Sequence, residues 1–250
     1  MIKATSKERR VADLIERKLL LSDPYYQLIL TMMKSVTPSN FHGKRILEVG
    51  CGLGGFCIRM AKMGANPVGL DISSSAINKA KDLAKQCEVQ NRVDFIIGDA
   101  QFLPFKEKSN EIVVCSETLE HVENYEQAFD ELVRVTENSG YLCLTVPNLF
   151  SSLFFEYMVL LSVGQPKYAK KLGNVEKEHI FHLFKVKKLL SREDLRLIDV
   201  RSTDFLHLPP TIRKVLRIDH YLNVLSEKLE KNGGPLRLFG ASIGVLGRKE

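Results

Sequence analysis

Apolar and polar residues are arranged along the chain so that short strands and amphipathic helices are expected in turn. Five apolar runs bounded by turn residues predict strands: RILEVG, NPVGLD, RVDFIIGD, EIVVCSE and YLCLTVP. Between them, residues 54–64, the stretch SSSAINKAKDLAKQC and the stretch around Tyr125 to Val133 carry apolar residues at helical spacing. RLIDVRSTDF and ASIGVLGR predict two further strands. This alternation predicts an α/β protein, with a mostly parallel sheet covered by helices on both faces.

The same pattern divides the chain into an N-terminal part and a main domain. Residues 1–40 are expected to form a helical cap, with a helix-start signal at Asp23 and Pro24 before YYQLILTMMKSV. Residues 41–250 are expected to form the α/β domain, interrupted by inserts at about 148–182 and about 207–235. The first insert follows the fifth strand, at the edge where open parallel sheets bind ligands, and is therefore expected to cover a substrate.

Composition excludes several classes of protein. The 250 residues are 44% hydrophobic and 26% charged, which is typical of a globular protein and not of a disordered one. The net charge of +6 is spread along the chain, so a nucleic-acid partner is not indicated. The five cysteines form no C-x-x-C pair and lie mostly in apolar runs, and the N-terminus is charged, so a reduced, cytoplasmic protein is expected.

The longest apolar stretch is LFSSLFFEYMVLLSVG, residues 149–164, which a basic tail continues to residue 171. It is too short to cross a bilayer and includes Glu156, but its apolar face and basic end are compatible with peripheral contact with a membrane. A helix packed on the domain is the alternative interpretation.

The stretch EVGCGLGG, residues 48–55, predicts a nucleotide-binding loop after the first strand. Glycines there allow a tight turn and a close approach to a ligand. The stretch fits both the G-x-G-x-x-G pattern of dinucleotide dehydrogenases and the E-x-G-x-G-x-G pattern of methyl-transfer enzymes. Asp71, 21 residues after Gly50, is placed to accept from ribose hydroxyls in either case.

Two acidic residues favour a cofactor without phosphates. Glu48 precedes the glycines, where a carboxylate is unfavourable beside a pyrophosphate and favourable beside a cationic ammonium or sulfonium. Asp99, after the third predicted strand, is placed to accept from an adenine amino group.

With ILEVGCGLGG, VGLDIS, IIGDA followed by FLPF, and EIVVCSETLEHV in this order, the chain resembles the class I S-adenosylmethionine-dependent methyltransferases. The resemblance is tight over about 44–148 and looser beyond, and extends to the branch of O-methyltransferases of quinone biosynthesis. It implies a Rossmann-like, seven-stranded sheet with an antiparallel last strand, and S-adenosyl-L-methionine as cofactor. It also implies the following cofactor-binding residues: Glu48, Gly50, Cys51, Gly52 and Gly54 at the methionine part, Asp71 and Ile72 at the ribose and adenine, Asp99 and Ala100 at the adenine, and Ser116 on the reactive side.

Methyl transfer needs mainly a nucleophile held close and in line, with a base when the acceptor carries a proton. The candidates for that base are His121, His179 and His182. The E-x-x-E-H element at Glu117, Glu120 and His121 resembles a metal-binding element of some O-methyltransferases, so a divalent metal is a second possibility. In the alternative to metal binding, the acidic residue lies at the start of a helix and the histidine shapes the acceptor pocket.

The sequence therefore predicts a methyltransferase that acts on a small, partly apolar acceptor, with O-methylation favoured by the E-x-x-E-H element. Methylation of RNA or protein, a non-catalytic cofactor-binding partner protein, and a dinucleotide oxidoreductase remain open at this point.

Overall fold

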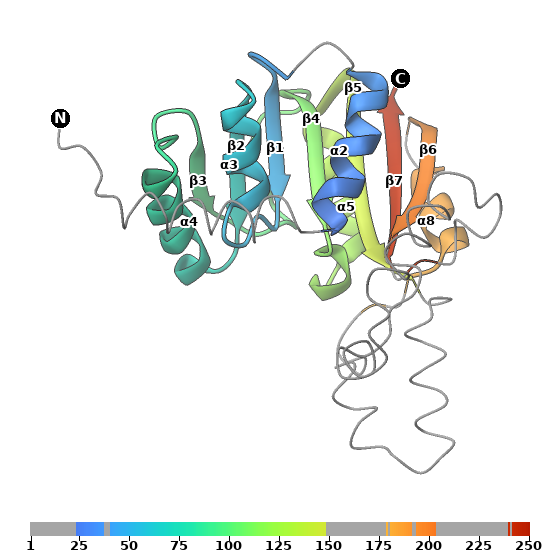
Figure 1. The fold of residues 1–250 in the computed structure, drawn as a ribbon. Helices are drawn as coiled ribbons and strands as arrows, with labels where there is room; N and C mark the ends of the chain where they lie inside the picture. Colours follow the sequence, from blue (N-terminus) through green and yellow to red (C-terminus); the bar gives the residue numbers. More distant parts are fainter. Residues whose placement is uncertain are drawn as a thin grey trace, which may run out of the picture.

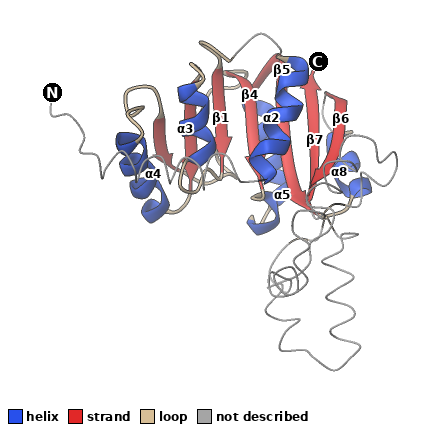
Figure 2. Cartoon of the chain, in the orientation of Figure 1, coloured by secondary structure: helices blue, strands red, loops and turns tan. Residues whose placement is uncertain are grey.

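The computed structural model describes residues 24–37, 41–148, 179, 181–191, 194–203, 240 and 242–250. Within this part of the chain, helices cover both faces of a seven-stranded sheet (Figures 1 and 2). The strands are β1 (Arg45–Val49), β2 (Asn66–Asp71), β3 (Asp94–Ile97), β4 (Asn110–Ser116), β5 (Thr136–Pro147), β6 (Leu195–Thr203) and β7 (Ser242–Lys249). The helices are α2 (Pro24–Val36), α3 (Gly55–Lys62), α4 (Ser74–Gln86), α5 (Tyr125–Val135) and α8 (Leu183–Leu190), with a short 3₁₀ turn, η2 (Leu119–His121). The predicted α/β class is confirmed.

The strand order is β3-β2-β1-β4-β5-β7-β6. The first five strands are parallel, whereas β7 runs antiparallel to both β5 and β6, as the resemblance implied. The chain moves outward from β1 to β3 and then returns to the other side of β1 as β4. Because helices cross on opposite faces at this reversal, the carboxyl ends of β1 and β4 border the crevice in which such sheets bind ligands.

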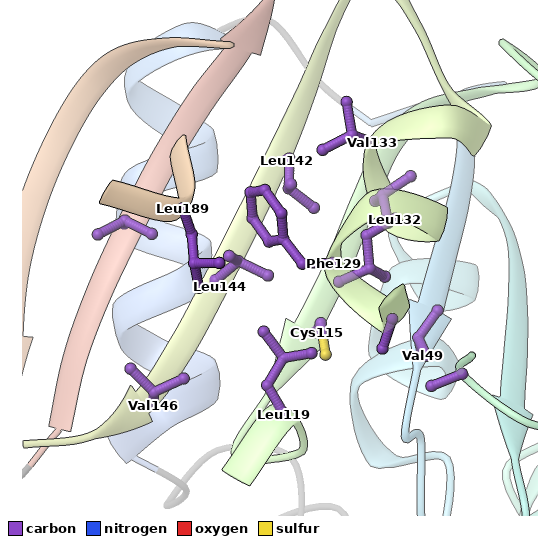
Figure 3. Close-up of a cluster of buried hydrophobic side chains, with 14 of the residues drawn as sticks. Val49, Cys115, Leu119, Phe129, Leu132, Val133, Leu142, Leu144, Val146 and Leu189 are labelled. Carbon is purple, nitrogen blue, oxygen red and sulfur yellow. The ribbon is translucent and has the colours of Figure 1, made fainter. Parts of the chain in front are cut away.

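Two apolar layers hold the helices on the sheet. On one face, α3 packs on β2 and α2 packs on β5, β6 and β7, and Met32 and Phe56 share a buried cluster with Ile46 and Val114. On the other face, α5 packs on β4 and β5 and α8 packs on β6, and Phe129 of α5 lies beside Leu142 and Leu144 of β5 (Figure 3). Successive side chains of β1 point to opposite faces of the sheet. Because helices cover both faces, the apolar residues at positions 46, 47 and 49 are all buried, as expected for a central strand.

Strand β5 begins earlier than the sequence predicts. The apolar run YLCLTVP predicts a strand that starts at Tyr141, but the strand already includes Asn138, Ser139 and Gly140. The pairing with β4 jumps from Asn110 opposite Thr136 to Ile112 opposite Tyr141, so these residues form a bulge, with φ at Ser139 of 64°. A turn-like triplet can therefore mark an irregularity inside a strand as well as a connection before it.

Strand β7 lies between β5 and β6 and is the only partner of β6 among the described strands. Near its end, the ammonium of Lys249 is buried and donates to the carbonyl oxygens of Val133 (2.6 Å) and Thr136 (2.9 Å). These two residues lie on either side of the junction between α5 and β5. The lysine therefore joins the last strand to that junction, with its charge solvated by backbone oxygens.

Much of the two predicted inserts and of the N-terminal cap lies outside the described residues. Of residues 1–40, the structure describes α2 and Thr37, and α2 packs directly on the sheet. The stretch 149–171 is likewise not described. At the points where the described chain stops, Asn148 donates to the carbonyl oxygen of Gly240 at 2.9 Å, and the Gly240 amide donates to the Ser202 hydroxyl at 3.1 Å. The ends of β5 and β6 and residue 240 are thereby held together.

Candidate active site

The loop that follows β1 approaches the end of β4 very closely. Gly50 has a φ of 76°, and a Cβ at this position would lie 2.2 Å from the hydroxyl oxygen of Thr118 and 2.4 Å from its methyl carbon. Thr118 is fixed because its hydroxyl donates to the carbonyl oxygen of Ser116 at 2.7 Å. Only glycine fits at position 50, for steric as well as conformational reasons.

Asp71, the last residue of β2, holds the same loop from the other side. One carboxylate oxygen accepts from the Gly52 amide at 2.8 Å, and the other accepts from the Ser73 amide at 2.8 Å. Ser73 is the N-cap of α4, where its hydroxyl accepts from the Ala76 amide. Asp71 therefore ties the glycine loop to the start of α4, in addition to any contact with a ligand.

The loop after β3 is held by residues of α5. Asp99 accepts from the Gln101 amide at 2.8 Å and fixes the start of this loop. Further along, the Glu131 carboxylate accepts from the Leu103 amide at 2.7 Å and from the guanidinium of Arg134. Arg134 in turn donates to the carbonyl oxygens of Leu103 and Phe105. A charged pair on one helix thus fixes the backbone next to Asp99.

This pair gives a pH-dependent contribution to stability. The hydrogen bond from Arg134 lowers the pKa of the Glu131 carboxyl below its ordinary value. Because the folded pKa is depressed, the contribution is present above the unfolded pKa of about 4.3 and is lost as the pH falls through the folded pKa. We expect Glu131→Gln to lower the free energy of unfolding by about 1 kcal/mol at neutral pH and by less near pH 3.

Urea unfolding of wild type and variant at several pH values measures this difference. Asp130→Asn, an exposed position on the same helix, is the control and should show no such dependence. A Glu131→Gln effect of the same size at neutral pH and near pH 3 would contradict the assignment.

The ends of the first four strands border a cavity of about 520 Å³. Seven of the residues selected from the sequence line it: Gly50, Asp71, Ile72, Asp99, Ala100, Glu117 and His121. Ile72 is 72% exposed, which leaves an apolar surface beside the Asp71 carboxylate. The cavity therefore combines a glycine loop, two carboxylates at strand ends and an open apolar side chain.

Other selected residues lie beneath the loop or behind the wall. Glu48 is buried and accepts a hydrogen bond from the thiol of Cys57 at 3.1 Å. Cys51 is buried as well, and the amide of the next residue, Gly52, donates to Asp71 as described above.

Gly54 and Ser116 do not line the cavity either. A Cβ at Gly54 would meet the ring of Phe95, so glycine at this position allows the start of α3 to pack against that ring. The hydroxyl of Ser116 is hydrogen-bonded to that of Thr145 at 2.9 Å.

The three named residues of the E-x-x-E-H element have different surroundings. Glu117 lines the cavity with a φ of 45°, and its carboxylate accepts from the Ser242 hydroxyl of β7 at 3.0 Å. Glu120 is 2% exposed, behind the wall, whereas the side chain of His121 is 57% exposed. Among the described residues, no group of three or more His, Cys, Asp or Glu side chains is arranged to hold a metal ion.

Both histidines of EHIFHLF form hydrogen bonds in the structure. The backbone amide of His179 donates to the Glu120 carbonyl at 2.8 Å, and its ring Nε2 lies 3.1 Å from the Glu123 carbonyl oxygen. This brings His179 against the wall formed by 117–123. His182 is instead the N-cap of α8, where its Nδ1 accepts from the Lys185 amide at 3.2 Å. Neither residue lines the cavity.

Six lining residues were not selected from the sequence: Leu70, Gly98, Gln101, Thr118, Val122 and Glu123. Each lies within two positions of a residue that was selected, so their proximity to the site could have been found by extending each motif. The contact of Thr118 with position 50 could not, because it depends on how β1 and β4 pair.

The lining of the cavity is negatively charged, whereas the chain as a whole is positively charged. Its described lining contains the carboxylates of Asp71, Asp99, Glu117 and Glu123, and no lysine or arginine. The chain as a whole has a net charge of +6. A ligand with positive charge is therefore favoured here, and a polyanion is disfavoured.

Comparison with known proteins identifies the class. Residues 47–144 match the model of a family described as a methyltransferase domain. The fold is that of an S-adenosylmethionine-dependent methyltransferase from Mesorhizobium loti, with a TM-score of 0.64 and 16% identity over 92% of this chain and 100% of the other. The chain therefore contains a class I S-adenosylmethionine-dependent methyltransferase domain, and S-adenosylmethionine is the cofactor of this class.

Two relatives with curated names match part of the chain. Norajmaline N-methyltransferase of Rauvolfia serpentina is 36% identical over 93 residues, which is 37% of this chain and 32% of the relative. The 27-O-demethylrifamycin SV methyltransferase of Amycolatopsis mediterranei is 36% identical over 105 residues, 41% of this chain and 38% of the relative. This chain thus spans about a third of the length of the relatives it matches. Their names cover both nitrogen and oxygen acceptors.

Proposed function

We propose that this protein transfers the methyl group of S-adenosylmethionine to a hydroxyl of a small, partly apolar molecule. The observation that carries the proposal is the acidic cavity between the glycine loop and His121, at the strand ends where this class of sheet binds ligands. The choice of oxygen as the acceptor atom rests on His121.

The residues of the cavity fit the cofactor. Asp71 would offer carboxylate oxygens to ribose hydroxyls, the exposed side chain of Ile72 would offer an apolar surface to a purine, and Gly50 lets the loop beside them pack closely on Thr118. The negative charge of the lining favours a cofactor that carries an ammonium and a sulfonium group. When bound, S-adenosylmethionine supplies an electrophilic methyl group whose departure leaves a neutral thioether.

His121 is placed to remove the acceptor proton. Its side chain is 57% exposed, lines the cavity, and has Nε2 3.8 Å from a carboxylate oxygen of Glu120. As the acceptor oxygen forms its bond to carbon, the imidazole takes the hydroxyl proton and passes it to solvent, and the electron pair of the breaking S–C bond stays on sulfur. Buried Glu120 stabilises the imidazolium that forms. The reaction therefore needs no reactant besides the acceptor and S-adenosylmethionine.

The lining also bears on the choice between acceptor classes. Four carboxylates would repel the phosphates of RNA, so a small molecule is favoured over a nucleic acid. The two relatives above are likewise named after small-molecule acceptors. An amine is the second candidate, because Glu117 and Glu123 would attract a protonated nitrogen.

Turnover tests the proposal directly. The protein is incubated with isotopically labelled S-adenosylmethionine and a panel of apolar phenols, alcohols, amines and an RNA, and the methylated atom is identified by mass spectrometry. We expect label on oxygen of a small acceptor. Label on nitrogen would overturn the O-methylation step alone, label on RNA would overturn the acceptor class, and cofactor binding without turnover on any acceptor would favour a non-catalytic partner protein.

A histidine variant tests the proton transfer. His121→Gln is expected to lower kcat on the true acceptor about tenfold, a modest loss because the exposed site gives water access to the same proton. The Kd for the cofactor should stay unchanged. His42→Gln, an exposed position in the turn before β1, serves as the control. Wild-type turnover by His121→Gln across the pH range would exclude the base role.

A further inference from the structure

One side chain joins the loop after β3 to the start of α5. Gln101 is half-buried and lines the cavity. Its side-chain nitrogen donates to the two carboxylate oxygens of Asp99, at 3.2 and 3.1 Å. Its side-chain oxygen accepts from the backbone amide of Asn124 at 3.2 Å. Both polar atoms of this side chain are therefore used, one toward a carboxylate of the cavity and one toward α5.

The first turn of α5 is built around the same contact. Asn124 is the N-cap of this helix, and its side-chain oxygen accepts from the Gln127 amide at 3.2 Å. The Gln127 side chain in turn donates to the carbonyl oxygen of Gln101 at 3.1 Å. The start of the helix is thus attached to residue 101 twice, and the attachment through the Gln101 side chain leads directly to the Asp99 carboxylate.

The segment in front of Asn124 supplies one wall of the cavity. It spans residues 117–123 and includes His121. The segment contains one 3₁₀ turn, η2, in which the His121 amide donates to the Thr118 carbonyl at 3.0 Å. Such a short turn has few hydrogen bonds of its own, so its position depends on what holds its ends. One of these ends is Asn124, which is held by Gln101.

We propose that Gln101 is a positioning residue that couples a ligand bound beside Asp99 to the start of α5, and so stabilises the wall that carries His121 when the cofactor is bound. The inference rests on the proposed function, because it takes the cofactor to be the ligand of this cavity. Such coupling is reciprocal, so an ordered start of α5 favours the ligand as much as the ligand favours the ordered start. The acceptor then meets a wall that the cofactor has already stabilised.

Amide hydrogen exchange measures this coupling without knowledge of the acceptor. A bound ligand slows exchange wherever local opening of the chain would break the site of the ligand. The described residues 124–128 do not line the cavity, so a ligand slows their exchange only if their opening disturbs the site. A purely structural role of Gln101 would change the exchange rates equally with and without ligand.

S-Adenosylhomocysteine is the ligand used in the experiment. In the wild-type protein, we expect saturation with it to slow exchange of the Asn124 and Gln127 amides by at least about fivefold. Gln101→Met keeps the length of the side chain but removes both polar atoms, so the slowing should fall below about twofold. The amides of residues 50–54 should stay protected in this variant. Gln86→Met, an exposed position at the end of α4, is the matched control and should behave like wild type.

A second variant separates the link to α5 from local support of Asp99. Gln101→Lys keeps a donor for the Asp99 carboxylate but offers no acceptor to the Asn124 amide. We expect its affinity for S-adenosylhomocysteine, measured by calorimetry, to stay within about threefold of wild type. The ligand-dependent slowing at Asn124 and Gln127 should nevertheless be lost.

The possible outcomes are distinct. Full slowing at the start of α5 in both Gln101 variants would overturn the inference, and so would a wild-type protein in which the ligand protects residues 50–54 but not Asn124 and Gln127. The proposed function would stand in either case. A wild-type protein that does not bind S-adenosylhomocysteine would instead overturn the proposed function. If Gln101→Met does not fold, as judged by circular dichroism, the Gln101→Lys measurement decides the matter.

Discussion

A Gly50→Ala variant is expected to lose cofactor binding by more than a thousandfold while remaining largely folded. The added methyl group would overlap the hydroxyl and methyl of Thr118, at 2.2 and 2.4 Å, and alanine disfavours the φ of 76° by about 1 kcal/mol or more. Relief requires the loop after β1 to move away from the end of β4. Such a movement closes or distorts the cavity that both border. Calorimetry with S-adenosylhomocysteine measures the loss, and circular dichroism measures the folded fraction.

Two further variants separate the clash from the backbone strain. Gly43→Ala has the same kind of strain, with φ of 74°, but a Cβ there meets no atom within 4 Å, so it should bind cofactor like wild type. Replacing Thr118 by glycine in the Gly50→Ala background removes the three atoms nearest to the added carbon and should restore part of the affinity. If the double variant binds no better than Gly50→Ala, the steric explanation is wrong.

The second large effect is expected at Asp71. Asp71→Asn should weaken cofactor binding about a hundredfold and lower the free energy of unfolding by about 2 kcal/mol. The carboxylate accepts from two amides, those of Gly52 and Ser73, one on each oxygen. An asparagine can accept with only one oxygen and turns an NH₂ group toward the other amide. The loop then loses one of its two attachments, and the ribose loses a charged acceptor.

Thermal unfolding without ligand and calorimetry with S-adenosylhomocysteine measure the two effects separately. Asp82→Asn, an exposed position of α4 whose side chain contacts Lys85, is the matched control and should change neither. A destabilised Asp71→Asn variant with wild-type affinity would show that the residue acts on the fold alone.

The fold was predictable because its signals are local. Each apolar run between turn residues became a strand, and Ser73, Asn124 and Pro24 mark the helix starts where capping chemistry places them. The start of β5 was not predictable, since Asn138 to Gly140 have the composition of a turn whether they precede a strand or bulge out of it.

The acidic residues of the site could be predicted from the sequence, but most of the contacts between its residues could not. Asp71 and Asp99 end the expected strands, but a sequence does not show that Asp71 binds the amide of Gly52. Thr118 meets Gly50 only because β1 and β4 pair side by side. His182 was a candidate base by residue type, whereas the structure uses its Nδ1 to cap α8. Residue type predicts what a side chain can do, and the fold decides which of these uses is open to it.

The position of β7 has a consequence for how the chain folds. Because β7 lies between β5 and β6, strand β6 has no neighbour in the described sheet until the residues from Ser242 onward have been made. A ribosome-bound chain therefore carries a strand with unsatisfied backbone groups for the time taken to synthesise about forty residues, at roughly 5–20 residues per second. During this interval β5 is also an open edge, to which a second copy could add a strand. Closing the sheet and protecting the chain against aggregation thus depend on one late event, the insertion of a single strand whose Lys249 then anchors it to α5.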